Sequence, residues 1–258
     1  MVRSSVPRKI LGVIPARFAS TRFPGKVLAQ IAAKTMLEHV YERASLSTYL
    51  TSVIIATDDD RIRTVARSFG ARVRMTRSDH LSGTDRAAEV ASAEEDVEIV
   101  VNIQGDEPLI SPDAIDAAIL PLVHEPDLVM GTLKKRIEDP REITDPNVVK
   151  VVTNRSGDAV YFSRCAIPFA REASGGTPYF KHIGLYVYRR DFLLAYPALP
   201  VGPLEAAERL EQLRALENGF SIRVVETEYE SLGVDTPQDL ERVSQLFDAA
   251  IIQGRGNG

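Results

Sequence analysis

The chain has 258 residues, a formal net charge of −5, one cysteine and 44% hydrophobic residues. The hydrophobic content predicts a packed globular protein, and the acidic balance argues against nucleic acid as the default partner. The single cysteine, Cys165, excludes an internal disulfide and fits a reducing compartment. Because no apolar run approaches a membrane span and the N-terminus lacks a signal-peptide core, we expect a cytoplasmic protein outside the membrane.

The first half of the chain alternates strand-like and helix-like segments. Apolar runs predict strands at residues 10–14, 53–57, 72–75 and 98–103, and helical patterns follow them at 35–44, 59–69, 82–94 and 111–124. This alternation predicts βαβ units, and therefore an α/β protein with a mostly parallel central sheet. The loops at the carboxyl ends of its strands should form the functional site.

The pattern changes after about residue 127. Strand-like segments follow one another at 128–136, 148–153, 159–164 and 180–188, and a hairpin turn at 154–158 separates two of them. The βα pattern resumes with a helix at 203–217, a strand at 221–227 and a helix at 237–251, and residues 253–258 look disordered. Since no linker flanks the antiparallel block, we expect a single domain, residues 1–258, with an antiparallel insertion at about 128–190.

The loop after the first strand is polar and cationic. Its cations are Arg17, Arg22 and Lys26. Ala16 and Ser20 are small enough for phosphate oxygens to approach the backbone N–H groups, and Pro24-Gly25 is a turn signal that would direct Lys26 back to the site. A strand that ends in such a loop is the usual phosphate site of an α/β protein. The loop is neither a Walker loop nor a dinucleotide fingerprint, and a surface loop with solvated cations is an equal alternative.

Two acidic residues remain once helix capping is accounted for. The run Asp58, Asp59, Asp60 lies where a helix N-cap and first turn belong, so capping is favoured over a metal cluster. Ser111 and Thr236 each precede a proline and begin the later helices, which leaves Asp106 and Asp235 without a capping role. Two such carboxylates suit Mg²⁺, which takes one or two carboxylates and completes its shell with substrate phosphates. The alternative for each residue is an exposed turn acid.

Other polar side chains have a structural and a functional interpretation. Residues 82–85 form a capping-box pattern, and Arg86, the next residue, has no capping role. Arg164 and His182 recur on or beside strands of the antiparallel block, where hairpin charges are usually solvated. Tyr186 is more often a sheet-packing residue than a ligand contact. The pair Glu211-Gln212 could hydrogen-bond sugar hydroxyls, although a solvated helix face is the default interpretation.

Taken together, motifs along nearly the whole chain resemble the 3-deoxy-manno-octulosonate (Kdo) cytidylyltransferases, also called CMP-Kdo synthetases. They begin with residues 15–26, Pro-Ala-Arg-Phe-Ala-Ser-Thr-Arg-Phe-Pro-Gly-Lys, and the others, in the order of the family, are residues 75–80, 82–86, 102–108, 161–164, 182–186, 203–205, 210–214 and 233–237. Phe18, Phe23 and Asp85 stand where the family more usually has Tyr, Leu and Glu, and residues 170–177 match no motif that we identify.

The resemblance implies a glycosyltransferase-A-like fold of the nucleotide-diphospho-sugar transferases. It implies a nucleotidyltransferase that uses CTP and Mg²⁺ to convert Kdo into CMP-Kdo for lipopolysaccharide biosynthesis, as a homodimer assembled through the antiparallel block. One alternative is a related transferase acting on another sugar acid, such as an 8-amino Kdo analogue. Another is a regulatory nucleotide-binding protein without catalysis, but the presence of both Asp106 and Asp235 argues against it.

The resemblance and the residue analysis together assign three groups of site residues. The predicted catalytic residues are Arg17, Lys26, Asp106 and Asp235, and the last two are the predicted Mg²⁺ ligands. The predicted nucleotide-binding residues are Ala16, Arg17, Ser20, Lys26, Thr76, Arg77, Ser82, Gln104 and Asp106. The predicted sugar-binding residues are Arg86, Arg164, His182, Tyr186, Glu211 and Gln212.

Overall fold

The computed structural model describes residues 9–19, 23–171 and 176–255. Within them, one sheet runs in the order β11 (Ile222–Glu226), β7 (Met130–Arg136), β10 (Phe180–Arg189), β6 (Val97–Asn102), β1 (Lys9–Pro15), β4 (Ser52–Thr57) and β5 (Arg72–Met75). β8 (Lys150–Thr153) pairs with β10 beside this path, and β9 (Ala159–Ser163) pairs with β8. A separate small sheet joins β2 (Gln30–Ile31) to β3 (Lys34–Thr35).

The strand directions confirm the predicted α/β class. β6, β1, β4 and β5 are parallel to one another, and β11 is parallel to β7. β10 is antiparallel to both β6 and β7, so it links two parallel groups of strands within one sheet. The strands predicted as an insertion therefore do not all leave the central sheet: β7 and β10 belong to it, whereas β8 and β9 extend from its side.

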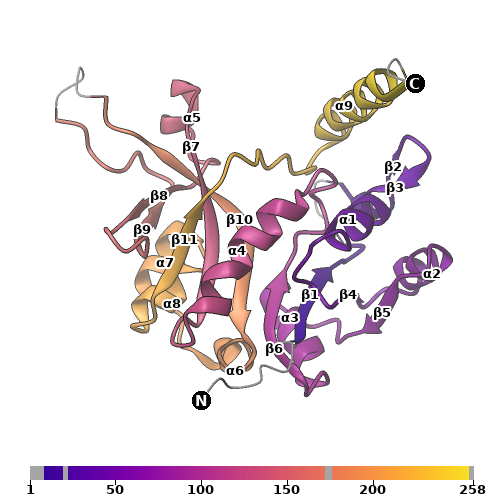
Figure 1. The fold of residues 1–258 in the computed structure, drawn as a ribbon, viewed down its shortest axis with the longest axis horizontal. Helices are drawn as coiled ribbons and strands as arrows, with labels where there is room; N and C mark the ends of the chain where they lie inside the picture. The colour runs from indigo at the N-terminus through magenta and orange to yellow at the C-terminus, as the bar shows by residue number, and fades with distance from the viewer. Residues whose placement is uncertain (1–8, 20–22, 172–175, 256–258) are drawn as a thin grey trace.

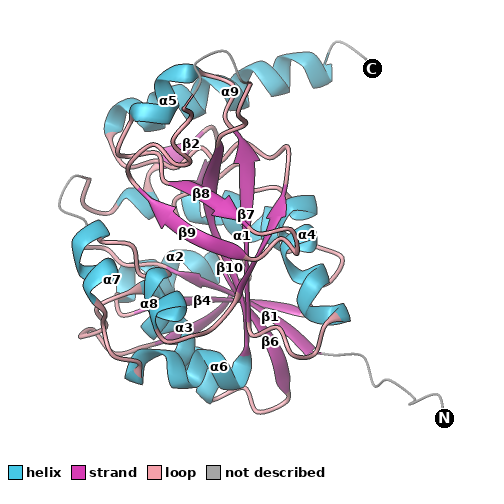
Figure 2. Cartoon of the chain, turned by 90° about the vertical axis from the view of Figure 1, so that its left-hand side faces the viewer, coloured by secondary structure: helices cyan, strands magenta, loops and turns pink. Residues whose placement is uncertain are grey.

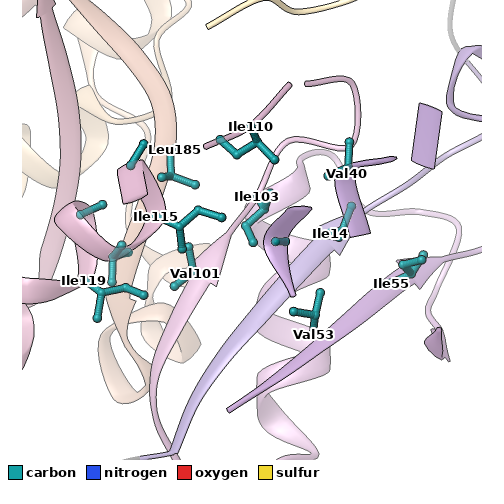
Figure 3. Packing of buried hydrophobic residues seen from close by; sticks show 14 of the residues in the cluster. Ile14, Val40, Val53, Ile55, Val101, Ile103, Ile110, Ile115, Ile119 and Leu185 are labelled. Atoms are coloured by element: carbon teal, nitrogen blue, oxygen red, sulfur yellow. The ribbon is translucent and has the colours of Figure 1, made fainter. Parts of the chain in front are cut away.

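Helices cover both faces of the sheet (Figures 1 and 2). On one face pack α1 (Met36–Ala44), α2 (Asp60–Ser68) and α4 (Pro112–His124), and on the other pack α3 (Gly83–Ser92), α6 (Arg190–Ala195) and α8 (Leu213–Glu217). The side chains of β1 alternate between these two cores: Ile10 and Ile14 face the first, and Leu11 and Val13 face the second. Figure 3 shows the first core, where Ile115 and Ile119 of α4 lie over Val101 of β6.

The capping residues predicted from the sequence begin the expected helices. Asp59 accepts a hydrogen bond from the backbone N–H of Arg61 at the start of α2, and Ser82 and Asp85 form a reciprocal capping box on α3. Ser111 caps α4, with a proline in its first turn. The caps of α2, α3 and α4 use neither Asp106 nor Asp235.

Two predicted boundaries are wrong. The helix expected at 203–217 is divided into α7 (Pro203–Glu208) and α8, because Arg209 adopts a left-handed conformation with φ of 52°. The side chain of Arg164 donates to the carbonyl of Glu208, the last residue of α7, at 2.8 Å. A residue distant in the sequence thus hydrogen-bonds to the carbonyl at the end of this helix. The last helix, α9 (Pro237–Arg255), extends into the tail that was expected to be disordered, and residues 256–258 lie outside the described residues.

The remaining helix, α5 (Pro140–Thr144), is a short turn after β7 that the sequence analysis did not predict. In the part of the chain that the structure describes, no helix is both long enough and apolar enough to cross a membrane.

Candidate active site

A cavity of about 550 Å³ opens where β1 and β6 end. This volume lies within the range typical of small-molecule sites. Its wall is formed by the loops after β1 and β6, the start of α3, and the residue two positions before α9. The lining residues are Pro15, Ala16, Arg17, Ala19, Lys26, Val27, His80, Ser82, Gly83, Arg86, Gln104, Gly105, Asp106 and Asp235. The structure thus brings together residues that are far apart in the sequence.

The loop after β1 turns at the predicted position. Gly25 has φ of 71°, which L side chains rarely adopt, and its N–H donates to the carbonyl of Phe18 at 2.9 Å. A Cβ at this position would lie 2.8 Å from the Phe18 ring. The turn places Lys26 in the cavity, as predicted. Ser20 and Arg22 lie outside the described residues.

The loops after β1 and β6 lie against each other at Gly105. A Cβ on this residue would be 2.9 Å from the carbonyl oxygen of Pro15, so only glycine permits this close approach. The contact brings Asp106 toward the cationic loop. The motif at 102–108 therefore needs glycine at position 105, because a larger residue would not fit there.

Lys26 lies between the two carboxylates that the sequence analysis singled out. Its Nζ is 2.6 Å from Oδ2 of Asp106 and 2.8 Å from Oδ1 of Asp235. Burial by itself would lower the pKa of Lys26, but attraction to and hydrogen bonding with Asp106 and then Asp235 outweigh it and raise the pKa above its usual value. The lysine is therefore an ammonium ion that neutralises part of the charge of the pair.

The donor set fits Mg²⁺. Two carboxylates from different loops already hold one cationic group, the ammonium of Lys26, between them. Among the described residues no cluster contains three or more His, Cys, Asp or Glu side chains able to hold a metal. A site with only two carboxylates suits Mg²⁺, which completes its shell with water and substrate phosphates. The residues that would hold it are Asp106 and Asp235.

Arg86 is a buried cation in the cavity wall. Only 4% of the residue is exposed, and its guanidinium donates to Oγ1 of Thr76 and lies 3.4 Å from Oδ1 of Asp58. Thr76 thus lies behind Arg86 rather than on the cavity surface. Arg77 does not line the cavity, because its guanidinium is exposed and paired with Asp79.

Four of the predicted sugar-binding residues do not line the cavity. Ser82, on the wall, is 3.4 Å from Oε1 of Glu211, and burial raises the pKa of Glu211 above its usual value. Nε2 of Gln104 donates to the carbonyl of Gly184 in β10 at 3.0 Å, just before Tyr186. The last two of the four are His182, whose ring centroid lies 5.4 Å from that of Tyr186, and Gln212.

Gln212 and Arg164 differ in the hydrogen bonds that their side chains make within the described protein. Gln212 is buried, and within the described part of the chain its Nε2 makes no hydrogen bond. Arg164 does not line the cavity, and its guanidinium donates to the carbonyls of Glu208 and Pro146. Its role in binding a sugar carboxylate stays a prediction, and binding there would compete with these bonds.

The sequence analysis did not select His80, which lines the cavity and hydrogen-bonds to Glu89 through Nε2. It belongs to the motif at 75–80, so the family resemblance contained a signal for it. Its partner, nine residues further along the chain in α3, could be identified only from the fold.

The imidazole of His182 is held in its neutral form. The hydroxyl of Thr132 lies 2.8 Å from the carbonyl of Leu185, to which it donates, and accepts from Nε2–H of His182 at 3.0 Å. Burial lowers the pKa of His182 to about 3 from its usual 6.5. Because the folded pKa lies below the unfolded value, the unfolded chain binds this proton first, and stability is lost as pH falls from 6.5 toward 3.

We therefore expect His182 to lower the free energy of unfolding by about 2 kcal/mol between pH 7.5 and pH 5. Urea denaturation at the two pH values would measure it. The variant His182→Gln should lose this part of the pH dependence, whereas His124→Gln, at an exposed histidine, should keep it. Equal pH dependence in His182→Gln and the unmodified protein would contradict the prediction.

Comparison with known proteins identifies the family of the chain. The cytidylyltransferase family model matches residues 11–226. The α/β fold, with its cation-lined cavity at the strand ends, is accordingly that of a nucleotidyltransferase of the cytidylyltransferase class. The chain is 81% identical to 3-deoxy-manno-octulosonate cytidylyltransferase of Solibacter usitatus, over 98% of this chain and 100% of the relative. It is 56% identical to the enzyme of that name from Geobacter metallireducens, over 91% of this chain and 96% of the relative.

A solved structure has nearly the same fold. It is that of CMP:2-keto-3-deoxy-manno-octonic acid synthetase in complex with CTP, and it superposes with a TM-score of 0.90 at 44% identity, over 94% of this chain and 99% of that one. The chain belongs to the 3-deoxy-manno-octulosonate cytidylyltransferase family. The predicted family and the predicted enzyme class, a nucleotidyltransferase, are confirmed.

Proposed function

We propose that this protein transfers CMP from CTP to Kdo, forming CMP-Kdo and releasing diphosphate, for lipopolysaccharide biosynthesis. The observation that carries the reaction type is the cavity in which Lys26 joins Asp106 to Asp235. The substrates follow from the relatives, which are named for Kdo and cytidylyl transfer at up to 81% identity, and from the related synthetase structure with CTP.

The nucleotide binds along the loop after β1. Arg17 and Lys26 neutralise its phosphates, and the backbone N–H groups between Ala16 and Ser20 add contacts. Ser82 and Gln104, which line the cavity, contact the cytosine and ribose. Thr76 acts through Arg86, to which it is hydrogen-bonded. Arg77 contributes only if its pair with Asp79 opens.

The reaction is a direct in-line displacement at the α-phosphorus of CTP. The anomeric hydroxyl of Kdo forms the new O–P bond as the bond to the diphosphate breaks, and the hydroxyl proton passes to solvent water. Such a step mainly requires positioning and neutralisation of charge. Asp106 and Asp235 would hold Mg²⁺, which when bound would lower the pKa of the hydroxyl and offset the phosphate charge. Arg17 and Lys26 stabilise the leaving diphosphate, and no covalent CMP–enzyme intermediate is formed.

The sugar acid binds on the side of the cavity formed by Arg86. A guanidinium offers bidentate geometry to a carboxylate. Arg164 is the proposed partner of the sugar carboxylate once its bonds to the carbonyls of Glu208 and Pro146 open, and Arg86 lies in the cavity wall beside Ser82. Tyr186, Glu211 and Gln212 supply groups for the hydroxyls next to Ser82 and Gln104, and the Nε2 of Gln212, which makes no hydrogen bond within the described part of the chain, is one available donor. His182, held neutral, supports the ring of Tyr186 rather than providing a charge.

The assembly and location are also part of this proposal. The chain acts as one domain, and a homodimer forms through the insertion at about 128–190. Val160 and Phe169 support this interface, because both are large apolar residues of that region and Phe169 is 88% exposed. The single cysteine supports a cytoplasmic location.

The test is diphosphate release from CTP and Mg²⁺ across a panel of sugar acids that includes Kdo and its 8-amino analogue. We expect Kdo to give the highest kcat/KM. A clear preference for the 8-amino compound would assign the chain to the alternative substrate instead. Binding of CTP without turnover of any sugar acid would contradict an enzymatic role.

A further inference from the structure

The segment at residues 227–235 carries Asp235 to the active site. It connects β11 to α9, contains neither helix nor strand, and crosses between the two halves of the molecule in Figure 1. A connection of this kind has no regular hydrogen-bond ladder to fix it. The position of the Asp235 carboxylate therefore depends on side-chain contacts along the segment.

One side of the segment is attached to the loop that carries Asp106. The hydroxyl of Tyr229 donates to Oε2 of Glu107 at 2.9 Å, and the side chain of Ser231 also hydrogen-bonds to Glu107. Three residues further on, the N–H of Val234 donates to the carbonyl of Asp106 at 2.9 Å. Glu107 is only 6% exposed, so its two hydroxyl partners replace the water that a carboxylate would otherwise bind.

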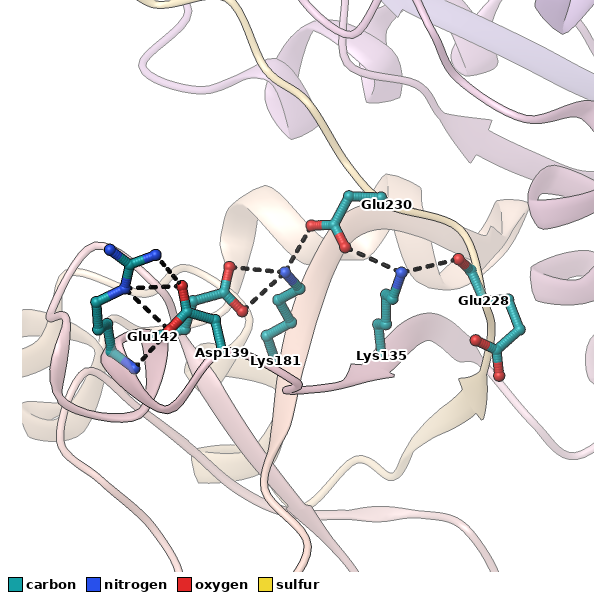
Figure 4. Close-up of polar contacts among 7 residues, drawn as sticks. Lys135, Asp139, Glu142, Lys181, Glu228 and Glu230 are labelled. Atoms are coloured by element: carbon teal, nitrogen blue, oxygen red, sulfur yellow. Dashed lines mark hydrogen bonds and ion pairs between the residues drawn. The ribbon is translucent and has the colours of Figure 1, made fainter.

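The other side of the segment is attached to the sheet. Glu230 lies between Tyr229 and Ser231 in the sequence but contacts different partners, Lys135 of β7 at 2.9 Å and Lys181 of β10 at 2.5 Å (Figure 4). Alternating partners are expected for an extended chain, because successive side chains point to opposite sides. Lys135 also donates to the carbonyl of Glu228 at 3.0 Å, which holds the backbone at the same point.

In the contact between Glu230 and the sheet, the lysine partner Lys181 is buried. Lys181 is 8% exposed, and its ammonium is shared between Glu230 and Glu142. A buried ammonium that loses one carboxylate partner is left partly uncompensated, which disfavours any movement of Glu230 away from it. The segment is thus held from two sides shortly before it reaches Asp235.

We propose that Glu107 and Glu230 are positioning residues that hold the 227–235 segment from opposite sides and thereby set the distance between the carboxylates of Asp106 and Asp235. Neither residue lines the cavity, so each acts through Asp235. The inference rests on the proposed function, in which Asp106 and Asp235 bind the divalent cation together. Loosening either attachment should weaken cation binding more than CTP binding.

Two conservative variants test this arrangement. Tyr229→Phe keeps the ring and removes the hydroxyl that donates to Glu107, and Glu230→Gln removes the charge that faces both lysines. The matched control is Glu125→Gln, which removes a carboxylate of similar exposure, paired with Arg223. Mn²⁺ binding to the enzyme with CTP but no sugar acid is followed by the EPR signal of free Mn²⁺, and Asp235→Asn serves as the reference for loss of a ligand.

We expect Tyr229→Phe and Glu230→Gln each to weaken Mn²⁺ binding by up to about tenfold, because they act one contact further from the metal than the direct partners of a ligand, whose loss costs about 10- to 100-fold. In kinetic assays the apparent Mg²⁺ constant should rise, while the KM for CTP at saturating Mg²⁺ stays unchanged, and Glu125→Gln should alter neither. Unchanged Mn²⁺ binding in either variant, beside clear weakening in Asp235→Asn, would overturn the positioning role alone. Unweakened binding in Asp235→Asn would instead overturn the metal assignment in the proposed function.

Discussion

Asp235→Asn is expected to keep the fold and to lower kcat about 100- to 1,000-fold, because ligands of a catalytic metal supply several kcal/mol of transition-state stabilisation. Asp106→Asn should behave in the same way. The fold should survive, since an amide oxygen can still accept the hydrogen bond from Lys26, and the contact between Val234 and Asp106 uses backbone atoms only. Diphosphate release at saturating CTP and Kdo would measure the loss.

The control for these variants is Asp96→Asn. Asp96 is also an aspartate paired with a lysine, but its partner is Lys9 and the pair is exposed on the surface. Exposed pairs contribute little, so this variant should retain full activity. Full activity of Asp235→Asn at limiting Mg²⁺ would show that the carboxylate is not a metal ligand. A trapped nucleotidyl-enzyme in any variant would exclude direct attack by the sugar.

The parts of the fold that depend on local patterns could be predicted from the sequence. The apolar runs of the first half and the caps at Asp59, Ser82 and Ser111 depend on residues close together in the chain. Asp106 and Asp235 were singled out because neither has a helix-capping role, and the structure brings both to Lys26; their role as Mg²⁺ ligands stays a prediction. The substrates could be predicted only from the family motifs, because the hydrophobic periodicity of the chain carries no information about them.

The features that the sequence did not predict depend on contacts between distant residues. The break at Arg209 accompanies the hydrogen bond from Arg164, 44 residues earlier, to Glu208. The place of β10 inside the central sheet depends on its pairing with β6 and β7, which no local pattern specifies. Periodicity predicts that a segment is a strand but says little about its neighbours.

The site shows the same division. The turn at Gly25 and the position of Lys26 followed from turn chemistry. The pairing of Arg77 with Asp79, away from the cavity, could not be predicted from the sequence. The sequence alone does not distinguish a cation near a strand end that faces the site from one that faces solvent. Glu107 could not be recognised either, since its partners Tyr229 and Ser231 lie more than a hundred residues further along the chain.

Because Lys26 lies between the two carboxylates, replacing it should have two opposite effects: tighter binding of the divalent cation and weaker binding of CTP. In this structure its ammonium contacts both carboxylates, whereas in the proposed reaction it contacts the phosphates of CTP. A divalent cation held by the same two carboxylates would compete with this ammonium. Lys26 would therefore weaken binding of the cation in the absence of nucleotide, and it would become available to the phosphates when the cation takes its place.

Lys26→Met should consequently bind Mn²⁺ more tightly than the unmodified enzyme when no CTP is present, and should bind CTP more weakly. Loss of one charge-assisted phosphate contact costs about 1.5–3 kcal/mol, which should raise the KM for CTP roughly 10- to 150-fold. EPR titration with Mn²⁺ and initial-rate kinetics would measure the two effects separately.

The thermal stability of Lys26→Met should also become dependent on metal. With the ammonium removed, the carboxylates of Asp106 and Asp235 face each other without their shared cation, so the melting temperature in EDTA should fall and Mg²⁺ should restore it more strongly than in the unmodified protein. Lys34→Met removes a lysine paired with Glu42 on the surface and should show neither effect. If Lys26→Met and Lys34→Met respond equally to Mg²⁺ and to CTP, Lys26 is neither the internal counterion of the metal site nor a phosphate ligand.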